Sequence, residues 1–344
     1  MTTAVVFGGT GFIGSYFANY LLEKRVVDRI LLADLRPVSN DRFSFLLKDG
    51  LETGAIKYLR CDVRLPIEEQ LASEVIEDLY LIANFAAVHR EPGHEHYEYY
   101  DTNLKGANNI CAWARRMGCM NIIFTSSIAP YGLNEKEISE ADIPKPVSAY
   151  GGSKLVAEKI HETWQAEDNA RRLTIVRPGV VFGAGEGGNV SRLIKATLKG
   201  YFFYMGNRNT RKAGVYVREL VHAMTWVHNL TSLPSQRSIL FNMTMSPSPS
   251  VEDYVETILK VAGVKKKIWS IPFSVLYPIS FCLEGAARVV GKSQPISPVR
   301  LRKLIRSNYI KPNFLEQSEY QYIYTLESAL AEWRKNAPHE WLNK

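Results

Sequence analysis

A tyrosine and a lysine four residues apart have the spacing for acid–base chemistry. Tyr150 and Lys154 begin and end the run Tyr-Gly-Gly-Ser-Lys. On a helix, side chains at this spacing share one face, so the lysine ammonium can lie near the phenol and favour its phenolate. A tyrosine, whose ordinary pKa is about 10, could then act as a general base near neutral pH. The pair predicts a site that removes a proton from a hydroxyl group.

Two adjacent serines supply a polar contact for the same chemistry. Ser126 and Ser127 stand at the end of the strand expected at residues 121–125. A hydroxyl from Ser127 or Ser126 can hydrogen-bond a substrate alcohol and the carbonyl that the alcohol becomes. We therefore group both serines with Tyr150 and Lys154 as catalytic candidates.

A glycine-rich turn near the N-terminus has the spacing of a dinucleotide-binding loop. Gly8, Gly11 and Gly14 follow the first expected strand and open a helix. Such a loop turns tightly, approaches a pyrophosphate and presents helix N-terminal amides to it. Asp34 ends the second strand, twenty residues after Gly14, where a carboxylate can accept hydrogen bonds from the adenosine ribose. Asp34 favours NAD over NADP, and Arg36 beside it keeps that choice open.

A second carboxylate follows the third expected strand, in the run Cys61-Asp62-Val63. The carboxyl ends of such strands face a bound dinucleotide. We expect Asp62 near the adenine ring, and the alternative is an ordinary loop carboxylate.

The elements that must position these residues alternate along the chain. Short apolar runs that are typical of buried strands occur at residues 4–7, 30–33, 56–59, 79–85, 121–125 and 173–176. Helix-length segments separate most of them, which implies right-handed βαβ units and a parallel sheet covered on both faces. A further strand at residues 215–217, with the helix after it, is assigned to the same domain.

Several motifs together resemble the extended short-chain dehydrogenase/reductase family of sugar epimerases and dehydratases. The matching pieces are GGTGFIG at 8–14, Asp34, CDV at 61–63, NFAA at 84–87, Asn103, TSSIAPYG at 125–132, YGGSK at 150–154, RPGVVFG at 177–183 and YVREL at 216–220. The resemblance implies an α/β fold, with a doubly wound Rossmann sheet that binds NAD and a smaller C-terminal α/β substrate lobe. We place the NAD-binding domain at residues 1–178 plus 214–245 and the lobe at 179–213 plus 246–344.

The resemblance also implies roles for individual residues. Tyr150 is the base, Lys154 its partner and a ligand of the nicotinamide ribose, and Ser127 the contact to the substrate hydroxyl. The expected cofactor-binding residues are Gly8, Gly11, Phe12, Ile13, Gly14, Asp34, Arg36, Asp62, Val63, Ala86, Ala87, Asn103, Tyr150, Lys154 and Pro178. The substrate candidates are His89, Arg90, Ser127, Asn189 and Arg211. Arg90 could pair with a phosphate or have a structural role.

Four segments narrow the resemblance to one branch of the family. Residues 86–90, 124–133, 188–190 and 295–303 are similar to enzymes that epimerise N-acetylglucosamine at C4 on undecaprenyl diphosphate, through a transient 4-keto sugar, for surface polysaccharides. The alternatives are a soluble UDP-sugar 4-epimerase or dehydratase and a hydroxysteroid- or sterol-type dehydrogenase. Ile128 and Ala129 stand where a dehydratase carries acidic residues, which disfavours dehydration. The intact Ser127, Tyr150 and Lys154 set disfavours a non-catalytic NAD-sensing protein.

The composition is that of an ordinary globular protein. The chain has 344 residues, 46% hydrophobic and 22% charged, which excludes disordered, collagen-like and disulfide-scaffold classes. The four cysteines lack a CxxC spacing, so we expect no metal site and a reducing cytoplasm. The family suggests a homodimer through helices around residues 103–117 and 153–164.

The net charge of +7 is concentrated near the C-terminus. Residues 285–315 contain no acidic side chain and seven basic ones, Arg288, Lys292, Arg300, Arg302, Lys303, Arg306 and Lys311. The apolar stretch at 268–283 before them is too short for a membrane span. It could rest on the anionic inner face of the cell membrane, or it could be core beside a solvated basic face. Nucleic-acid binding would rest on net charge alone, so we expect no nucleic-acid partner.

Overall fold

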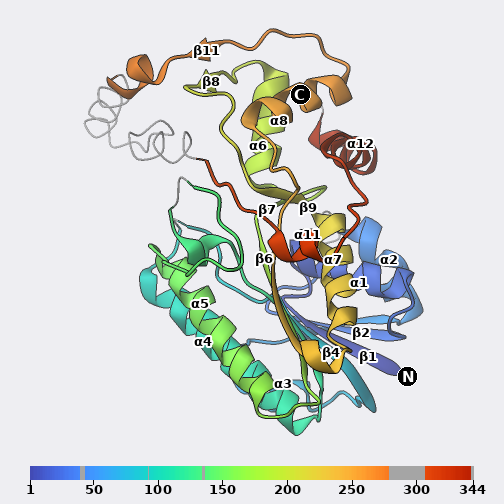
Figure 1. Ribbon diagram of the computed structural model, residues 1–344. Helices are drawn as coiled ribbons and strands as arrows, with labels where there is room; N and C mark the ends of the chain where they lie inside the picture. The colour runs from blue at the N-terminus through green and yellow to red at the C-terminus, as the bar shows by residue number, and fades with distance from the viewer. Residues whose placement is uncertain (39–42, 92, 134–135, 279–306, 342–344) are drawn as a thin grey trace.

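The protein is built on a parallel sheet. The structure, a computed structural model, describes residues 1–38, 43–91, 93–133, 136–278 and 307–341. Within these ranges, seven strands form the main sheet in the order β10-β6-β5-β4-β1-β2-β3 (Figure 1). They are β1 (Thr2–Phe7), β2 (Arg29–Asp34), β3 (Ile56–Arg60), β4 (Asp78–Asn84), β5 (Asn121–Thr125), β6 (Arg172–Pro178) and β10 (Ser238–Met243). The order reverses between β1 and β4, and ligands bind such sheets at the carboxyl ends beside this point.

Both faces of the sheet are buried, as the continuous apolar runs predict. Ala4 and Val6 of β1 belong to one hydrophobic cluster, and Val5 and Phe7 belong to a second one. Successive side chains of a strand point to opposite faces, so the two clusters are the two layers of core on either side of the sheet. All four residues have no exposed surface.

Helices cover each face. On one face lie α1 (Phe12–Glu23), α2 (Ser44–Thr53) and α7 (Val217–Leu230), and on the other lie α3 (Ile67–Leu71), α4 (His96–Arg116) and α5 (Ala149–Ala166). Figure 1 shows α4 and α5 side by side, separated by the sheet from α1 and α7. The arrangement confirms the predicted α/β fold with a doubly wound parallel sheet.

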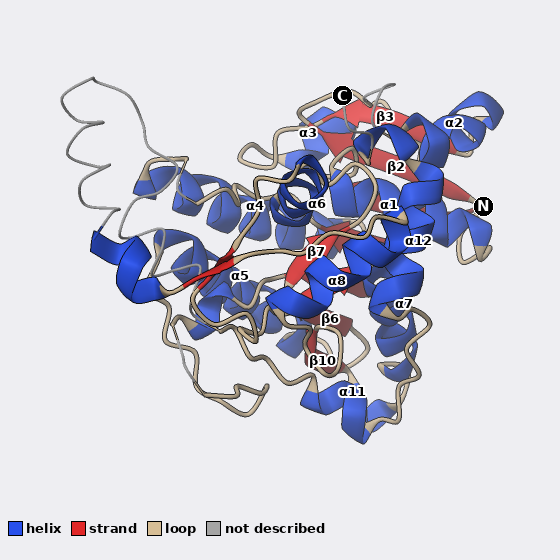
Figure 2. Ribbon diagram, turned by 90° about the horizontal axis from the view of Figure 1, so that it is seen from above, coloured by secondary structure: helices blue, strands red, loops and turns tan. Residues whose placement is uncertain are grey.

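A smaller group of elements lies above the carboxyl ends of the strands. It contains α6 (Asn189–Lys199), α8 (Val251–Ala262), α12 (Leu326–Asn336) and two two-stranded sheets, β7 (Val180–Phe182) with β9 (Gly214–Tyr216) and β8 (Tyr204–Met205) with β11 (Ser270–Ile271). Figure 1 and Figure 2 show α6 next to α8, and α6 also contacts β7. The short helix α11 (Asn313–Gln317) packs on β10. Three 3₁₀ turns complete the described elements, η1 (Ala129–Tyr131), η2 (Pro234–Gln236) and η3 (Pro338–Glu340).

Two strands differ from the sequence prediction. The strand expected at residues 215–217 exists as β9, but β9 pairs with β7 and not with the main sheet. The seventh strand of the main sheet is β10, which pairs with β6 and was not predicted. The domain boundaries remain a prediction.

The C-terminal basic segment falls largely outside the described residues. Arg288, Lys292, Arg300, Arg302, Lys303 and Arg306 belong to that part, as do residues 279–283 of the apolar stretch and the matching piece at 295–303. Lys311 is described, and its amine forms an ion pair with Glu316 at 3.5 Å. Among the described residues, no helix is long and apolar enough to cross a membrane.

Candidate active site

The glycine loop lies against the segment that follows β4. Gly8 has a φ of +73°, and a Cβ atom there would stand 2.7 Å from the backbone nitrogen of Ala86. A Cβ atom on Gly14 would stand 2.4 Å from the Gly8 carbonyl oxygen. Neither contact is tolerable, so only glycine lets the loop turn this tightly and lets α1 begin this close to the sheet.

The N-terminus of α1 is suited to an anion. Gly11 is the residue before the helix and provides no side-chain cap, and the first turn contains no acidic residue. Phe12 and Ile13 open the helix, so their backbone amides point out of its positive end. Together with the tight loop, these amides fit the pyrophosphate of a dinucleotide.

Asp34 ends β2 beside this loop. Its carboxylate accepts hydrogen bonds from the backbone amides of Thr10 and Arg36, both at 3.2 Å. The Thr10 hydroxyl donates to the Arg36 carbonyl at 3.0 Å, and the Arg36 side chain is exposed. The carboxylate is therefore fixed at the carboxyl end of β2, where the ribose of a bound dinucleotide was expected.

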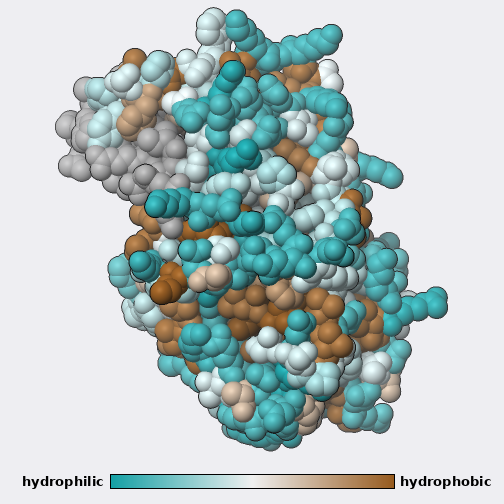
Figure 3. All heavy atoms as spheres, in the orientation of Figure 1, coloured by the Kyte–Doolittle hydropathy of each residue, from teal (hydrophilic) through white to brown (hydrophobic). Residues whose placement is uncertain are grey.

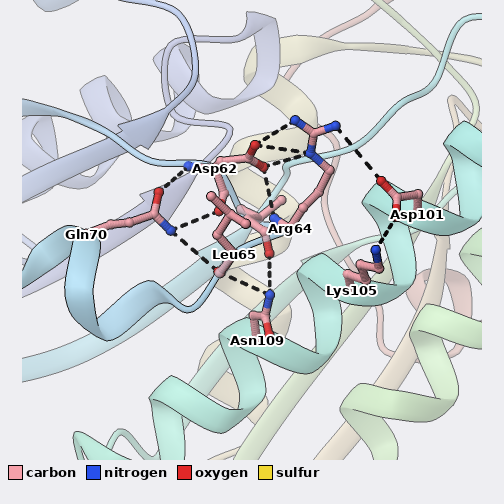
Figure 4. Close-up of polar contacts among 8 residues, drawn as sticks. Asp62, Arg64, Leu65, Gln70, Asp101, Lys105 and Asn109 are labelled. Carbon is pink, nitrogen blue, oxygen red and sulfur yellow. Dashed lines mark hydrogen bonds and ion pairs between the residues drawn. The ribbon is translucent and has the colours of Figure 1, made fainter.

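Asp62 lies in a hydrogen-bonded loop and is already paired with Arg64 (Figure 4). The Arg64 guanidinium donates to both carboxylate oxygens, with Nη2 at 2.6 Å from Oδ2. Hydrogen bonds from Arg64 lower the pKa of Asp62. The Gln70 side chain bonds the backbone of Asp62, and Asn109 donates to the carbonyl of Val63 at 2.9 Å. Contact with adenine remains a prediction for Asp62 and Val63.

Asn103 connects the loop after β4 with the helix that carries Tyr150. Its amide bonds both the N–H and the carbonyl of Val88, and it donates to the Ser153 hydroxyl at 2.8 Å. The Ser153 hydroxyl donates to the Tyr150 carbonyl at 2.8 Å. The Asn103 side chain is buried and bonded by protein groups, so its direct effect is to hold the loop after β4, which contains Ala86 and Ala87, against α5.

The structure brings Tyr150 and Ser127 together. The start of α5 packs on the turn after β5, where a Cβ atom on Gly151 would stand 2.6 Å from the Ala129 carbonyl oxygen. Burial raises the pKa of Tyr150 to about 12, and a hydrogen bond with Ser127 opposes this rise. The Ala129 amide donates to the Ser127 hydroxyl oxygen at 3.1 Å, which leaves the Ser127 hydrogen free to donate to the phenol oxygen.

Lys154 is buried one turn further along α5. Its amine lies 4.5 Å from the centre of the Phe124 ring. Burial lowers the pKa of Lys154 to about 7, and the charge of Glu158 opposes this fall. The sequence predicted that Lys154 acts on Tyr150, and the structure adds two further residues. Ser127 lowers the pKa of Tyr150, and the charge of Glu158 raises the pKa of Lys154.

Ser126 has a different environment, which sequence reasoning missed. Its hydroxyl donates to the buried carboxylate of Glu158. Arg177, the residue before Pro178 at the end of β6, donates to the same carboxylate from Nε at 2.8 Å and from Nη2 at 2.6 Å. The signal for Glu158 in the sequence was only its position one turn after Lys154.

The predicted substrate residues are less closely grouped. His89 and Arg90 are exposed after β4, and the exposed Asn189 begins α6, where it accepts a hydrogen bond from Arg192. Arg211 donates to the Ser248 carbonyl at 2.6 Å. The next residue, Lys212, was not singled out from the sequence, and burial lowers its pKa to about 8. No group of three or more potential metal-ligating side chains occurs among the described residues.

The family follows from a comparison of the sequence with known families. Residues 4–239 match the model described as the NAD dependent epimerase/dehydratase family. The chain belongs to this family. The match confirms the predicted family resemblance and the prediction of an NAD-dependent enzyme of the epimerase type. The tight glycine loop, the uncapped α1 and Asp34 fit NAD, the family's cofactor.

Members of the NAD-dependent epimerase/dehydratase family also match over most of their length. The chain is 28% identical over 270 residues to N-acetyl-alpha-D-glucosaminyl-diphospho-ditrans,octacis-undecaprenol 4-epimerase of Escherichia coli O157:H7, covering 78% of this chain and 80% of that one. It is 26% identical over 290 residues to UDP-glucose 4-epimerase of Lactobacillus helveticus, covering 76% and 82%. UDP-glucuronic acid 4-epimerase from Bacillus cereus, solved with NAD, has a TM-score of 0.74 at 16% identity, covering 99% and 100%. This last similarity confirms the fold.

Proposed function

We propose that this enzyme is an NAD-dependent 4-epimerase of an N-acetylhexosamine carried on a diphosphate, with undecaprenyl diphosphate as the carrier. The observation that carries the chemistry is the Ser127 hydroxyl beside the Tyr150 phenol, whose pKa it lowers, with Lys154 one turn along the same helix. The carrier is supported by the similarity to the undecaprenol-linked 4-epimerase of Escherichia coli. The product would serve surface polysaccharide synthesis.

In the proposed reaction, Ser127 hydrogen-bonds the C4 hydroxyl of the sugar and Tyr150 removes its proton. NAD, when bound, supplies the redox chemistry that converts the C4 alcohol to a ketone and back. The 4-keto sugar turns within the pocket, and Tyr150 returns the proton on completion. Because burial raises the Tyr150 pKa to about 12, the phenolate needs stabilisation, which the Ser127 hydroxyl and the Lys154 ammonium provide. General-base catalysis of this kind contributes roughly 10²–10⁴-fold.

The pocket must accept both faces of the turning sugar, so the diphosphate should supply most of the binding energy. We assign that contact to three basic side chains. Arg90 and Arg211 were predicted, and Lys212 is added by its burial beside Arg211. His89 and Asn189 remain proposed substrate contacts.

A surface near β11 supports a lipid-linked carrier. Trp269 is 73% exposed and Val275 is 49% exposed, and three exposed lysines, Lys265, Lys266 and Lys267, precede Trp269. Figure 3 shows some hydrophobic side chains among more polar ones at this edge of the molecule, next to the atoms drawn grey. Exposed aromatic and aliphatic side chains beside lysines are typical of contact with an anionic membrane surface.

The substrate is tested by offering UDP-linked and undecaprenyl-diphosphate-linked N-acetylglucosamine to the purified enzyme side by side. Interconversion of the lipid-linked sugar at C4 would support the proposal. Interconversion of the UDP sugar alone would favour a nucleotide-sugar epimerase, and a 4-keto-6-deoxy product would favour a dehydratase. Oxidation of a hydroxysteroid without action on either sugar would favour the sterol-type alternative.

The membrane contact is tested with anionic vesicles at low salt. The triple exchange of Lys265, Lys266 and Lys267 to Glu should release the protein from the vesicles, because each lysine near the surface contributes about 1 kcal/mol. The control variant has the same change in net charge at another part of the surface, with Lys24, Lys48 and Lys335 replaced by Glu. Equal release by both variants, or no binding of the unaltered protein, would contradict a contact through this surface.

We also propose a homodimer through the outer sides of α4 and α5. Tyr97 of α4 is 69% exposed, and Val156 of α5 is 42% exposed. Burial of such side chains against a second copy would remove apolar surface from water. Sedimentation of the protein and of a Val156→Glu variant tests this, and a monomeric unaltered protein would contradict it.

A further inference from the structure

A buried carboxylate joins three segments beneath the proposed site. Glu158 has no exposed surface. Arg177 donates to both of its oxygens, from Nε at 2.8 Å and Nη2 at 2.6 Å, and the Ser126 hydroxyl donates to Oε1. The bidentate geometry fixes the carboxylate and the guanidinium relative to each other.

Each group in this cluster is next to a proposed site residue in the sequence or on the helix. Ser126 directly precedes Ser127 at the end of β5, and Arg177 directly precedes Pro178 at the end of β6. Glu158 lies one turn after Lys154 on α5. The backbones of the two strand ends are also joined, because the Ser126 amide donates to the Val176 carbonyl at 2.7 Å.

Arg177 is held on its other side by an aromatic ring and a further hydrogen bond. Its guanidinium lies 4.7 Å from the centre of the Tyr131 ring, and the Tyr131 hydroxyl donates to Asn242 of β10 at 2.9 Å. Asn242 donates to the Lys311 carbonyl at 3.1 Å. These contacts connect the cluster to β10 of the main sheet and to Lys311 in the C-terminal part of the chain.

Stability alone gives a weak reason for this arrangement. A buried ion pair loses hydration that its mutual attraction repays only partly, and well-packed apolar residues are often equally stabilising. The pair also contacts the end of β5, the end of β6 and α5, which carry proposed site residues. This position is a second reason for its presence.

We propose that Glu158 and Arg177 are positioning residues for the reaction proposed above: their ion pair fixes Ser127 through Ser126, and the Glu158 carboxylate maintains the positive charge of Lys154. This inference rests on the proposed function for its effect on turnover. Its electrostatic part concerns the folded protein alone and can be measured without substrate.

The other ionisable groups around Lys154 are neutral or positively charged near pH 7, so Glu158 supplies the negative charge that acts on Lys154. Burial lowers the pKa of His161, also on α5, to about 4, so this ring is neutral near pH 7. His89, after β4, also has a lowered pKa, from desolvation and from the charges of Arg90 and Lys154. Tyr150 is kept protonated by burial. Hydrogen bonds and the charge of Glu158 outweigh burial and raise the pKa of Arg177, which stays charged.

The test is a titration of Lys154 in protein labelled with ¹³C at the lysine Cε position, with the signal assigned by its loss in a Lys154→Met variant. Glu158→Gln keeps the shape and removes the charge, so the titration midpoint should fall by about one pH unit or more. Arg177→Gln breaks the same ion pair but keeps the carboxylate, so the midpoint should stay or rise. A purely structural pair would give both variants the same change, which would overturn the proposal.

Controls separate charge from position. Glu162→Gln makes the same substitution at an exposed site on α5, where Glu162 pairs with Lys159 at 2.7 Å, and it should leave the midpoint unchanged. Ser126→Ala keeps the ion pair, so it should leave the midpoint in place and lower turnover at least several-fold. Unchanged turnover in Ser126→Ala would overturn the positioning of Ser127. If Glu158→Gln does not fold, Arg177→Gln decides, because a lowered midpoint there would overturn the proposal.

The same variants distinguish this inference from the proposed function. If the unaltered protein epimerises neither sugar, the proposed function fails, while the Lys154 midpoints still support or overturn the electrostatic role of Glu158. If the unaltered protein is active, the alkaline limb of its turnover should move to lower pH in Glu158→Gln and not in Glu162→Gln.

Discussion

Ser126 and Ser127 are adjacent in the sequence, yet their hydroxyl groups bond to different sides of the proposed site. The Ser126 hydroxyl donates to the buried Glu158 carboxylate, whereas the Ser127 hydroxyl accepts from the Ala129 amide and lowers the pKa of the Tyr150 phenol. Successive side chains at a strand end point in opposite directions, which explains why one serine faces the interior and the other faces the phenol.

This difference predicts different effects for two equivalent substitutions. Ser127→Ala should lower turnover at least about 10²-fold with little change in stability, because it removes the hydroxyl beside the reacting group. Ser126→Ala should lower the free energy of unfolding by about 1.5–3 kcal/mol, because it removes a hydrogen bond to a charged group. Turnover and urea unfolding measure the two effects. A greater loss of turnover in Ser126→Ala would mean that Ser127 is not the substrate contact.

Tyr150→Phe deletes the proposed base and keeps the ring. We expect turnover to fall at least about 10²-fold while NAD binding and the melting temperature stay close to those of the unaltered protein. Tyr97→Phe, at a residue that is 69% exposed on α4, is the matched control and should have normal turnover. Near-normal turnover in Tyr150→Phe would rule out Tyr150 as the base.

Asp34→Ala should weaken the binding of NAD and leave the fold intact. The carboxylate stands at the end of β2, held by the amides of Thr10 and Arg36, where it can accept from the ribose hydroxyls. Calorimetric titration with NAD and NADP should show weaker NAD binding and a reduced preference over NADP. Glu52→Ala, in an exposed ion pair on α2, is the control. An unchanged NAD affinity in Asp34→Ala would remove this residue from the site.

The buried His161 should make the fold sensitive to acid. Its ring stacks on Phe124 with centroids 4.2 Å apart, and its nitrogens bond the Ala157 carbonyl and the Asn84 amide. Burial lowers its pKa from 6.5 to about 4, so between these values the unfolded chain binds a proton that the folded chain does not. Stability from this group is complete above pH 6.5 and falls by about 3 kcal/mol as the pH drops to 4.

The measurement is the free energy of unfolding against pH for the unaltered protein and for a His161→Gln variant. The variant should be less stable at pH 7 and should show a shallower loss between pH 6.5 and 4. Parallel curves for the two proteins would show that His161 is not held neutral.

Glu219 should anchor the C-terminal part of the chain to α7. Its buried carboxylate accepts from the Tyr320 hydroxyl at 2.6 Å and from the amides of Ile323 and Tyr324 at 2.9 and 2.7 Å. Glu219→Ala should lower the free energy of unfolding by about 3 kcal/mol or more, because three donors lose a charged acceptor. Faster proteolysis within residues 318–325 should accompany it. Arg218→Ala, in the neighbouring ion pair with Glu332, is the control and should change proteolysis less.

The sequence by itself determined the elements of the sheet and the residues with local spacing. The strand predicted at residues 121–125 has the same bounds in the structure, and the strand predicted at 30–33 differs from β2 by one residue at each end. Burial on both faces of a parallel sheet requires continuous apolar runs, which are visible in one dimension. The glycine spacing of the α1 loop and the interval between Tyr150 and Lys154 are local in the same sense.

The tertiary structure decided which of these residues meet. The partners of the Glu158 carboxylate, Ser126 and Arg177, come from β5 and β6, so no local period relates them to α5. The same holds for β10, a short apolar run that becomes the edge strand only by pairing with β6. Local patterns report which backbone conformation is favoured, whereas hydrogen bonds between distant segments depend on where the whole sheet places their ends. That is why the charge of Lys154 and the separate roles of the two serines emerge only from the fold.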